Sequence, residues 1–423
     1  MHLNLHGRTK PVSRRGFLQL SSAAGLMGSN FLSQIGVSAE QLKKEQRACI
    51  LVWLAGAPSQ MDTFDPKPGT PNGGATKSIK TAVPGIEIAE FFPKVAQMMN
   101  DVSIIRSMAG KEAAHERGTY HLHTGRRLTG TLKFPSFGSV VANEIGDPDF
   151  DLPNFVSIGK TVSSGFLGVR VAPFVVNRPG ELPANVSTVI AQERQRKRLA
   201  LLKSQDSDFE KAGAAELVKE HELLYRRATR LMASPGLKAF QLETASESDK
   251  LAYGKTPLGQ GLLVARQLVE AGVPFVEVRR GGWDMHSNLW RNMPRAAADV
   301  DNGLSQLMTD LKQRGMFEKT LVICMGEFGR TPKINARPPA PGRDHWARNF
   351  ATLLAGSGIK GGQVVGKTDV NGQEIIDRPV EVEDLFQTLC KSMGVNADKE
   401  LYSTSGRPLR IVDGGEPVSE ILA

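Results

Sequence analysis

Two short segments in the second half of the chain place acidic and imidazole groups directly after apolar runs. Asp284 and His286 follow the run 273–279, and Glu327 follows the run 320–325. Residues two apart in an extended chain point to the same side, so Asp284 and His286 could bind one metal ion together. A carboxylate and a neutral imidazole are common ligands of zinc or iron. A simple hydrogen bond between the two side chains is the alternative interpretation.

Similar groups follow other apolar or loop segments. Asp62 lies in a Gly-Pro loop after the apolar run 48–55, and His345 follows a proline-rich loop. A carboxylate at a strand end is a suitable hard ligand for a divalent cation, although a turn or helix cap would also explain Asp62. Arg330 and Arg343 lie in the same stretch as His345, and guanidinium groups suit bidentate binding of phosphate or sulfate. Structural ion pairs are the alternative for both arginines.

Three of the eight histidines lie within residues 115–123. On a helix, His115, Thr119 and His123 would share one face, whereas His121 would point elsewhere. Such clustering indicates a functional site more than chance on a surface. We therefore predict that His115 contributes to the site as a ligand, a general base or a nucleophile.

Four apolar runs of strand length predict central strands, and amphipathic periodicity between them predicts helices. The predicted strands are 48–55, 102–106, 273–279 and 320–325. The predicted helices are 92–99, 216–232, 259–271, 295–314 and 381–393. This alternation favours an α/β fold with a doubly wound, mostly parallel sheet and helices on both faces. We predict one domain over residues 40–423, with a β-rich and charged helical insertion around 160–255.

Residues 1–39 are predicted to be an export signal. Arg14 and Arg15 are followed by Phe17 and by a weakly apolar stretch that ends in small residues at Ala39. This pattern is typical of a twin-arginine signal, which predicts the twin-arginine export machinery as a partner and a periplasmic or extracellular location. A short membrane anchor is the alternative. The stretch is too polar to span well, so we expect no stable membrane span in the mature form.

The charge balance argues against nucleic acid as a partner. The chain has 53 basic and 44 acidic residues, a formal charge of +9. The first 39 residues hold four of the basic residues and no acidic one, so the remainder has 49 against 44, or +5. So small and scattered an excess is typical of a solvated surface. The cysteines, Cys49, Cys324 and Cys390, lie in apolar patterns, which predicts buried free thiols.

The chain resembles the exported bacterial proteins grouped as domain-of-unknown-function family 1501. The resemblance rests on four blocks spread over nearly the whole mature chain: WLAGAPSQMDTFDPKP, HERGTYHLHTGR, GGWDMHSN, and GEFGRTP with GRDHW. That family is similar to the alkaline phosphatase and sulfatase superfamily. The resemblance therefore implies an alkaline phosphatase/sulfatase-like α/β fold, usually with two metal ions, and hydrolysis of phosphate or sulfate esters.

Two residues depart from the pattern of that superfamily. His115 stands where the resemblance places a nucleophilic Cys, Ser or Thr, which leaves the usual covalent mechanism without its nucleophile. Phe328 stands where relatives have a metal-binding His. The second metal then lacks a nitrogen ligand unless His115 or His123 supplies it.

The residues and the resemblance together predict an exported, metal-dependent hydrolase of phosphate or sulfate esters, with a small anionic ester or a sulfated polysaccharide as substrate. Zinc is the expected metal, with calcium or manganese as alternatives. The predicted ligands are Asp284, His286 and His345 for one metal and Asp62 and Glu327 for a second. The predicted catalytic residues are His115 and, for oxyanion stabilisation, Arg330 or Arg343. The alternative is a catalytically degenerate, sulfatase-like binding protein of the cell envelope.

Overall fold

The computed structural model describes residues 47–130, 132–182, 186 and 192–423. Residues 47–423 form one compact unit. The predicted twin-arginine signal and the predicted domain start at residue 40 lie outside the described residues. Within the described part of the chain, no helix is long and apolar enough to cross a membrane.

A nine-stranded sheet forms the centre of this unit. Its strands follow the order β12 (Gln363–Val365), β4 (Val102–Ala109), β11 (Phe350–Gly356), β8 (Thr320–Met325), β1 (Ala48–Leu54), β7 (Phe275–Arg280), β5 (Phe155–Ile158) and β6 (Phe174–Val176). β15 (Val380–Glu381) also pairs with β4. β11 is antiparallel to β4 and β8, and the other pairs in this sheet are parallel. The predicted mostly parallel sheet is therefore confirmed.

The central strand β1 explains why the sheet is covered on both faces. All seven of its residues are buried. Ile50 and Val52 belong to one hydrophobic cluster, whereas Leu51 and Trp53 belong to another. Alternate residues of a strand point to opposite faces, so this strand needs an apolar partner layer on each side.

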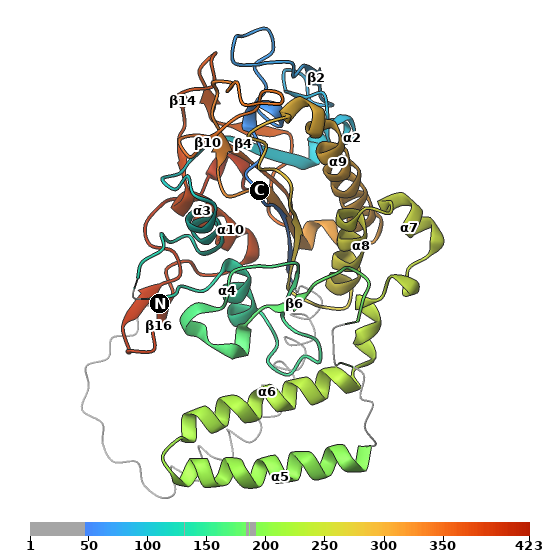
Figure 1. Cartoon of the computed structure of the whole chain (residues 1–423), viewed down its shortest axis with the longest axis vertical. Coiled ribbons are helices and arrows are strands. Elements are labelled where there is room, and N and C mark those ends of the chain that lie inside the picture. The colour runs from blue at the N-terminus through green and yellow to red at the C-terminus, as the bar shows by residue number, and fades with distance from the viewer. Residues whose placement is uncertain (1–46, 131, 183–185, 187–191) are drawn as a thin grey trace, which may run out of the picture. The chain divides into compact units, whose positions relative to one another are not determined.

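Helices supply these two layers (Figure 1). The first cluster contains residues of α2 (Pro93–Gln97), α8 (Pro257–Glu270) and α9 (Leu289–Gln313). The second contains residues of α3 (His115–Thr124), α4 (Phe137–Glu144) and α10 (Val382–Met393). The prediction of helices on both faces is confirmed, which completes the doubly wound fold class.

The remaining elements lie outside the main sheet. They are the helices α5 (Gln192–Lys211), α6 (Ala215–Ala233) and α7 (Glu247–Tyr253), and the paired strands β2 (Ser78–Lys80) with β3 (Glu87–Ala89), β9 (Gly329–Arg330) with β10 (His345–Trp346), β13 (Lys367–Thr368) with β14 (Ile375–Asp377), and β16 (Glu400–Tyr402) with β17 (Pro408–Arg410). Described residues between 160 and 255 form β6 and these three helices. The segment predicted as an insertion is therefore more helical than β-rich.

The predicted element boundaries agree well for the strands and less well for one helix. β8 occupies the predicted residues, and β4 extends past the predicted end to Ala109. α9 begins at Leu289 rather than at residue 295 and contains Pro294, a residue type that usually marks a helix boundary. All three cysteines are buried and free, as predicted.

Candidate metal centre

The loops after β1 and β7 meet closely at the carboxyl edge of the sheet. Gly56 follows β1 with φ +109, and a Cβ atom there would lie 2.4 Å from the backbone nitrogen of Asp284. Only glycine allows both this backbone conformation and this approach. The loop carrying Asp284 therefore packs directly on the end of the central strand.

Helix α3 brings His115 to the same edge. His115 is the first residue of α3, and Gly118 packs one turn later against the loop after β8. A Cβ atom on Gly118 would lie 2.8 Å from Cδ1 of Phe328 and 3.0 Å from the carbonyl oxygen of Glu327. This close packing places Nδ1 of His115 2.7 Å from Oε1 of Glu327.

Three imidazole rings converge on the carboxylate of Asp284. Its Oδ1 atom lies 3.0 Å from Nε2 of His286 and 3.3 Å from Nε2 of His345. Its Oδ2 atom lies 3.3 Å from Nε2 of His115. The Nε2 atoms of His286 and His345 are 3.0 Å apart. Ligand atoms of His115, Asp284 and His345 all lie within 4.8 Å of one another, a spacing that could hold a metal ion.

Each of these rings is also held at its Nδ1 atom by an oxygen on the outer side. Nδ1 of His286 lies 2.7 Å from Oδ1 of Asp344. Nδ1 of His345 lies 2.8 Å from the carbonyl oxygen of Ala113. His115 has the corresponding contact with Glu327. An Nδ1–H donated to each oxygen leaves an Nε2 lone pair directed inward, which is the usual arrangement of metal-binding histidines.

The donor atoms fit a small divalent cation. Two Nε2 lone pairs 3.0 Å apart repel each other unless a proton or a cation lies between them. Ligands at about 2.0–2.1 Å from a tetrahedral zinc ion lie about 3.3 Å apart, close to the separations around Asp284. Nε2 of His115 and Oε2 of Glu327 are buried and have no hydrogen-bond partner among the described residues. Such orphaned atoms are costly unless a ligand satisfies them.

Charged neighbours set the protonation of the cluster. Burial raises the pKa of Asp284, but the hydrogen bond and positive charge of Arg330 outweigh it and lower that pKa to about 2. The hydrogen bond to Glu327 raises the pKa of His115, although burial opposes it. Burial lowers the pKa of His345, which favours its neutral, metal-binding form.

The two predicted catalytic arginines are buried and bound to other protein groups. Arg330 donates to Asp284 and to the carbonyl oxygens of Gly56, Ala57 and Arg343. It therefore adds positive charge beneath Asp284 without an exposed guanidinium face. Burial lowers the pKa of Arg330, and its ion pair with Asp284 opposes that effect.

Asp62 and Arg343 form a separate, fully buried ion pair. Nε of Arg343 donates to Oδ2 of Asp62 at 2.7 Å, and both side chains have no exposed surface. The Asp62 carboxylate also accepts hydrogen bonds from Ser59, Thr76 and Trp290. Asp62 is not part of the ligand group around Asp284 among the described residues. Arg343 lies 281 residues after Asp62 in the sequence, so spacing alone gave no signal for this pair.

Phe328 and His123 complete the surroundings of the cluster. The Phe328 ring lies 5.2 Å from the His115 ring and 4.8 Å from the His345 ring, measured between centroids. Phe328 therefore packs on two imidazole rings at the position where the resemblance places a metal-binding His. His123 lies on α3 but faces the core, with Nε2 3.2 Å from the buried Glu277. Of the histidines in residues 115–123, His115 therefore reaches the site, whereas His123 lies in the core.

Comparisons with known proteins give the family of the chain. Residues 46–422 match the model of the family described as protein of unknown function, DUF1501. The chain belongs to this family. A comparison with curated proteins found no significant match.

Solved structures with similar folds include three bacterial proteins. The PsFucS1 sulfatase from Pseudoalteromonas sp. is 16% identical, with 86% of this chain and 71% of that chain covered and a TM-score of 0.38. A protein in the alkaline phosphatase superfamily from Vibrio parahaemolyticus is 12% identical, with 89% and 71% covered and a TM-score of 0.38. The phosphonate monoester hydrolase of Agrobacterium radiobacter is 14% identical, with 88% and 78% covered and a TM-score of 0.38. At such low identity and TM-score, none of these likenesses assigns an activity to this chain.

Proposed function

We propose that this protein is a metal-dependent hydrolase of phosphate or sulfate esters that acts outside the cytoplasm. The observation that carries the proposal is the convergence of the three Nε2 atoms of His115, His286 and His345 on Asp284, each ring being held at its Nδ1 atom. The twin-arginine pattern at Arg14 and Arg15 supports the location.

Asp284, His286 and His345 would hold the metal, with His115 as a fourth ligand or as a base beside it. Zinc suits this donor set best because it accepts mixed nitrogen and oxygen ligands. Manganese is compatible, whereas three imidazoles disfavour calcium, which prefers oxygen. When bound, a divalent metal would lower the pKa of a water molecule and polarise the ester oxygen.

The protein's own groups have distinct roles in this proposal. Arg330 orients Asp284 through its hydrogen bond and provides positive charge toward an anionic ester. Glu327 accepts hydrogen bonds from Nδ1–H of His115 and from the backbone N–H of Gly56. These bonds fix the orientation of the His115 ring. Arg343 and Asp62 hold the surrounding loops together instead of contacting substrate.

The test combines metal analysis with activity. Purified mature protein is analysed for bound metals and then assayed with an aryl phosphate and an aryl sulfate, before and after chelation. The proposal expects bound metal and turnover that is lost with the chelator and regained with zinc. Absence of both metal and turnover under metal-replete conditions would overturn it.

A second role, binding without turnover, is favoured by one observation. Position 115 carries an imidazole tied to Glu327 where the resemblance places a nucleophile. This alternative is a catalytically degenerate binding protein of the cell envelope. Metal bound at full occupancy, with no hydrolysis of either ester class but saturable binding of a sulfated polysaccharide, would favour it.

A further inference from the structure

A cavity lies at the opposite ends of the strands from the candidate metal centre. Its volume is about 410 Å³, within the range of roughly 300–1,000 Å³ that is usual for small-molecule sites. Phe155 and Phe174 line it, and they begin β5 and β6. Asp284 follows the carboxyl end of β7, which is parallel to β5. The cavity is therefore built from the amino ends of the strands.

The walls of this cavity are mainly apolar. They come from the loop before β5, from the short helical turn Val169–Val171 and from one side of α6. The apolar contacts include Leu152, Phe155, Val171, Phe174, Leu231 and Met232. A hydrophobic chain placed here would move from water onto an apolar surface, which favours binding in proportion to the apolar area buried.

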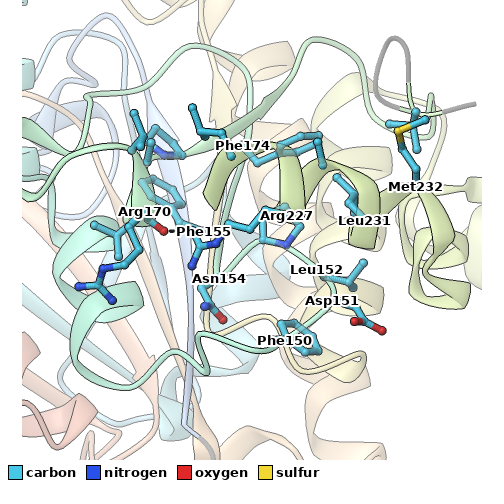
Figure 2. Close-up of a pocket in the computed structure, with 18 residues that line it drawn as sticks. Phe150, Asp151, Leu152, Asn154, Phe155, Arg170, Phe174, Arg227, Leu231 and Met232 are labelled. Carbon is cyan, nitrogen blue, oxygen red and sulfur yellow. Dashed lines mark hydrogen bonds between the residues drawn. The ribbon is translucent and has the colours of Figure 1, made fainter. Parts of the chain in front are cut away.

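Two cations line this cavity, Arg170 and Arg227, and neither forms an ion pair with a carboxylate of the described residues; Arg170 donates instead to the side-chain oxygen of Asn143. Arg227 of α6 lies between Phe155 and Leu231 in the cavity (Figure 2). Its guanidinium donates a hydrogen bond to the carbonyl oxygen of Arg170. Burial lowers the pKa of Arg227, and the charges of Arg170 and Arg230 lower it further.

The surrounding charges leave that cation available. Arg230 is paired with Asp149 at 3.4 Å. The acidic residue of the lining, Asp151, is exposed and lies by Leu152 rather than by Arg227 (Figure 2). An anionic ligand would therefore meet the Arg227 guanidinium, which has no carboxylate partner, on a mainly apolar wall, where a charge-assisted hydrogen bond is strong.

We propose that this cavity binds a single-chain amphiphile with a carboxylate head, such as a medium-chain fatty acid, with the carboxylate on Arg227 and the chain among the apolar residues. The apolar walls account for the chain, and the unpaired guanidinium accounts for the head. This site is independent of the metal centre, and its occupancy requires no turnover.

The binding test is calorimetric titration of the full chain with octanoate, decanoate and dodecanoate below their aggregation concentrations. One molecule should bind per chain, and affinity should rise about fourfold per added methylene. Decan-1-ol has a similar chain without the charge and should bind more weakly than decanoate. No saturable binding, or affinity that does not depend on chain length, would overturn the proposal.

Two matched pairs of variants on α6 locate the ligand. Arg227→Gln should weaken decanoate roughly tenfold and leave decan-1-ol unchanged, whereas Arg226→Gln, an exposed neighbour outside the lining, should leave both unchanged. Ala228→Trp, at an exposed lining position, should fill the cavity and abolish binding of both ligands. Thr229→Trp, exposed and outside the lining, should not. Binding that survives Ala228→Trp, or equal effects within a pair, would place the ligand elsewhere and overturn the assignment.

Discussion

At the level of single residues, the candidate metal centre depends on where each imidazole carries its proton. Nδ1 of His286 donates to Asp344, which leaves Nε2 for a metal. Groups that orient a ligand in this way commonly change metal affinity by about 10–100-fold when removed. Asp344→Ala should therefore weaken zinc binding by that factor without abolishing it. Competition with a chromogenic chelator measures the affinity, and Asp377→Ala on the exposed β14 is the control. Unchanged affinity in Asp344→Ala would contradict the assigned tautomer.

The buried pair of Asp62 and Arg343 gives a second prediction at this scale. Arg343→Met would leave Asp62 as an unpaired carboxylate with no exposed surface, so it should cost about 3–5 kcal/mol of unfolding free energy. Adding Asp62→Leu should recover part of that loss. Urea unfolding of the chelated protein measures both changes. Metal content should stay at the parent value in the double variant, and loss of the metal there would instead make Asp62 a ligand.

At the level of elements, α3 fixes the distance between His115 and the loop after β8. Gly118 provides this contact, because a Cβ there would overlap the Phe328 ring. Gly118→Ala should move the helix outward, cost about 1–3 kcal/mol of stability and lower metal affinity by separating His115 from Glu327. Unfolding and metal competition measure the two effects. Gly130→Ala is the control because nothing lies within 4 Å of its added Cβ. Equal effects in the two variants would contradict this role of α3.

The elements also show how far the sequence could predict this site. The buried strands β1, β7 and β8 were predictable because a central strand must be apolar on both faces. Their parallel pairing then places Asp284 and Glu327 at one edge. β11 was not predicted, although it separates β8 from β4 and all seven of its residues are buried, because its sequence FATLLAG contains no Val or Ile to favour a strand.

Pairings between distant residues were the least predictable part. The sequence pattern predicts that Arg343 binds an oxyanion. In the structure, its guanidinium N–H groups donate to Asp62 and to the carbonyl oxygens of Asn72, Thr331 and Pro332. Which carboxylate a guanidinium meets depends on loop conformation, and no periodicity encodes it. The anchoring of His345 by a carbonyl oxygen is invisible to sequence for the same reason, since any residue can supply that oxygen.

At the level of the whole molecule, the sheet separates two candidate sites. The metal centre uses polar groups that follow the carboxyl ends of the strands, and the amphiphile cavity uses apolar residues that begin β5 and β6. A rigid sheet would let each site be emptied or filled without rebuilding the other, so Arg227→Gln should not change metal content.

Metal binding should also stabilise the whole fold, because the ligands come from loops after different strands and from α3. A ligand that binds only the folded state raises the unfolding free energy by about 2.7 kcal/mol at a free concentration of 100 times its Kd. We expect zinc to give this increase in urea unfolding and a chelator to remove it. His345→Ala removes one of the nitrogen donors on Asp284, so the same zinc concentration should stabilise that variant much less. Equal stabilisation of both proteins would mean that zinc binds elsewhere, whether or not the protein hydrolyses an ester.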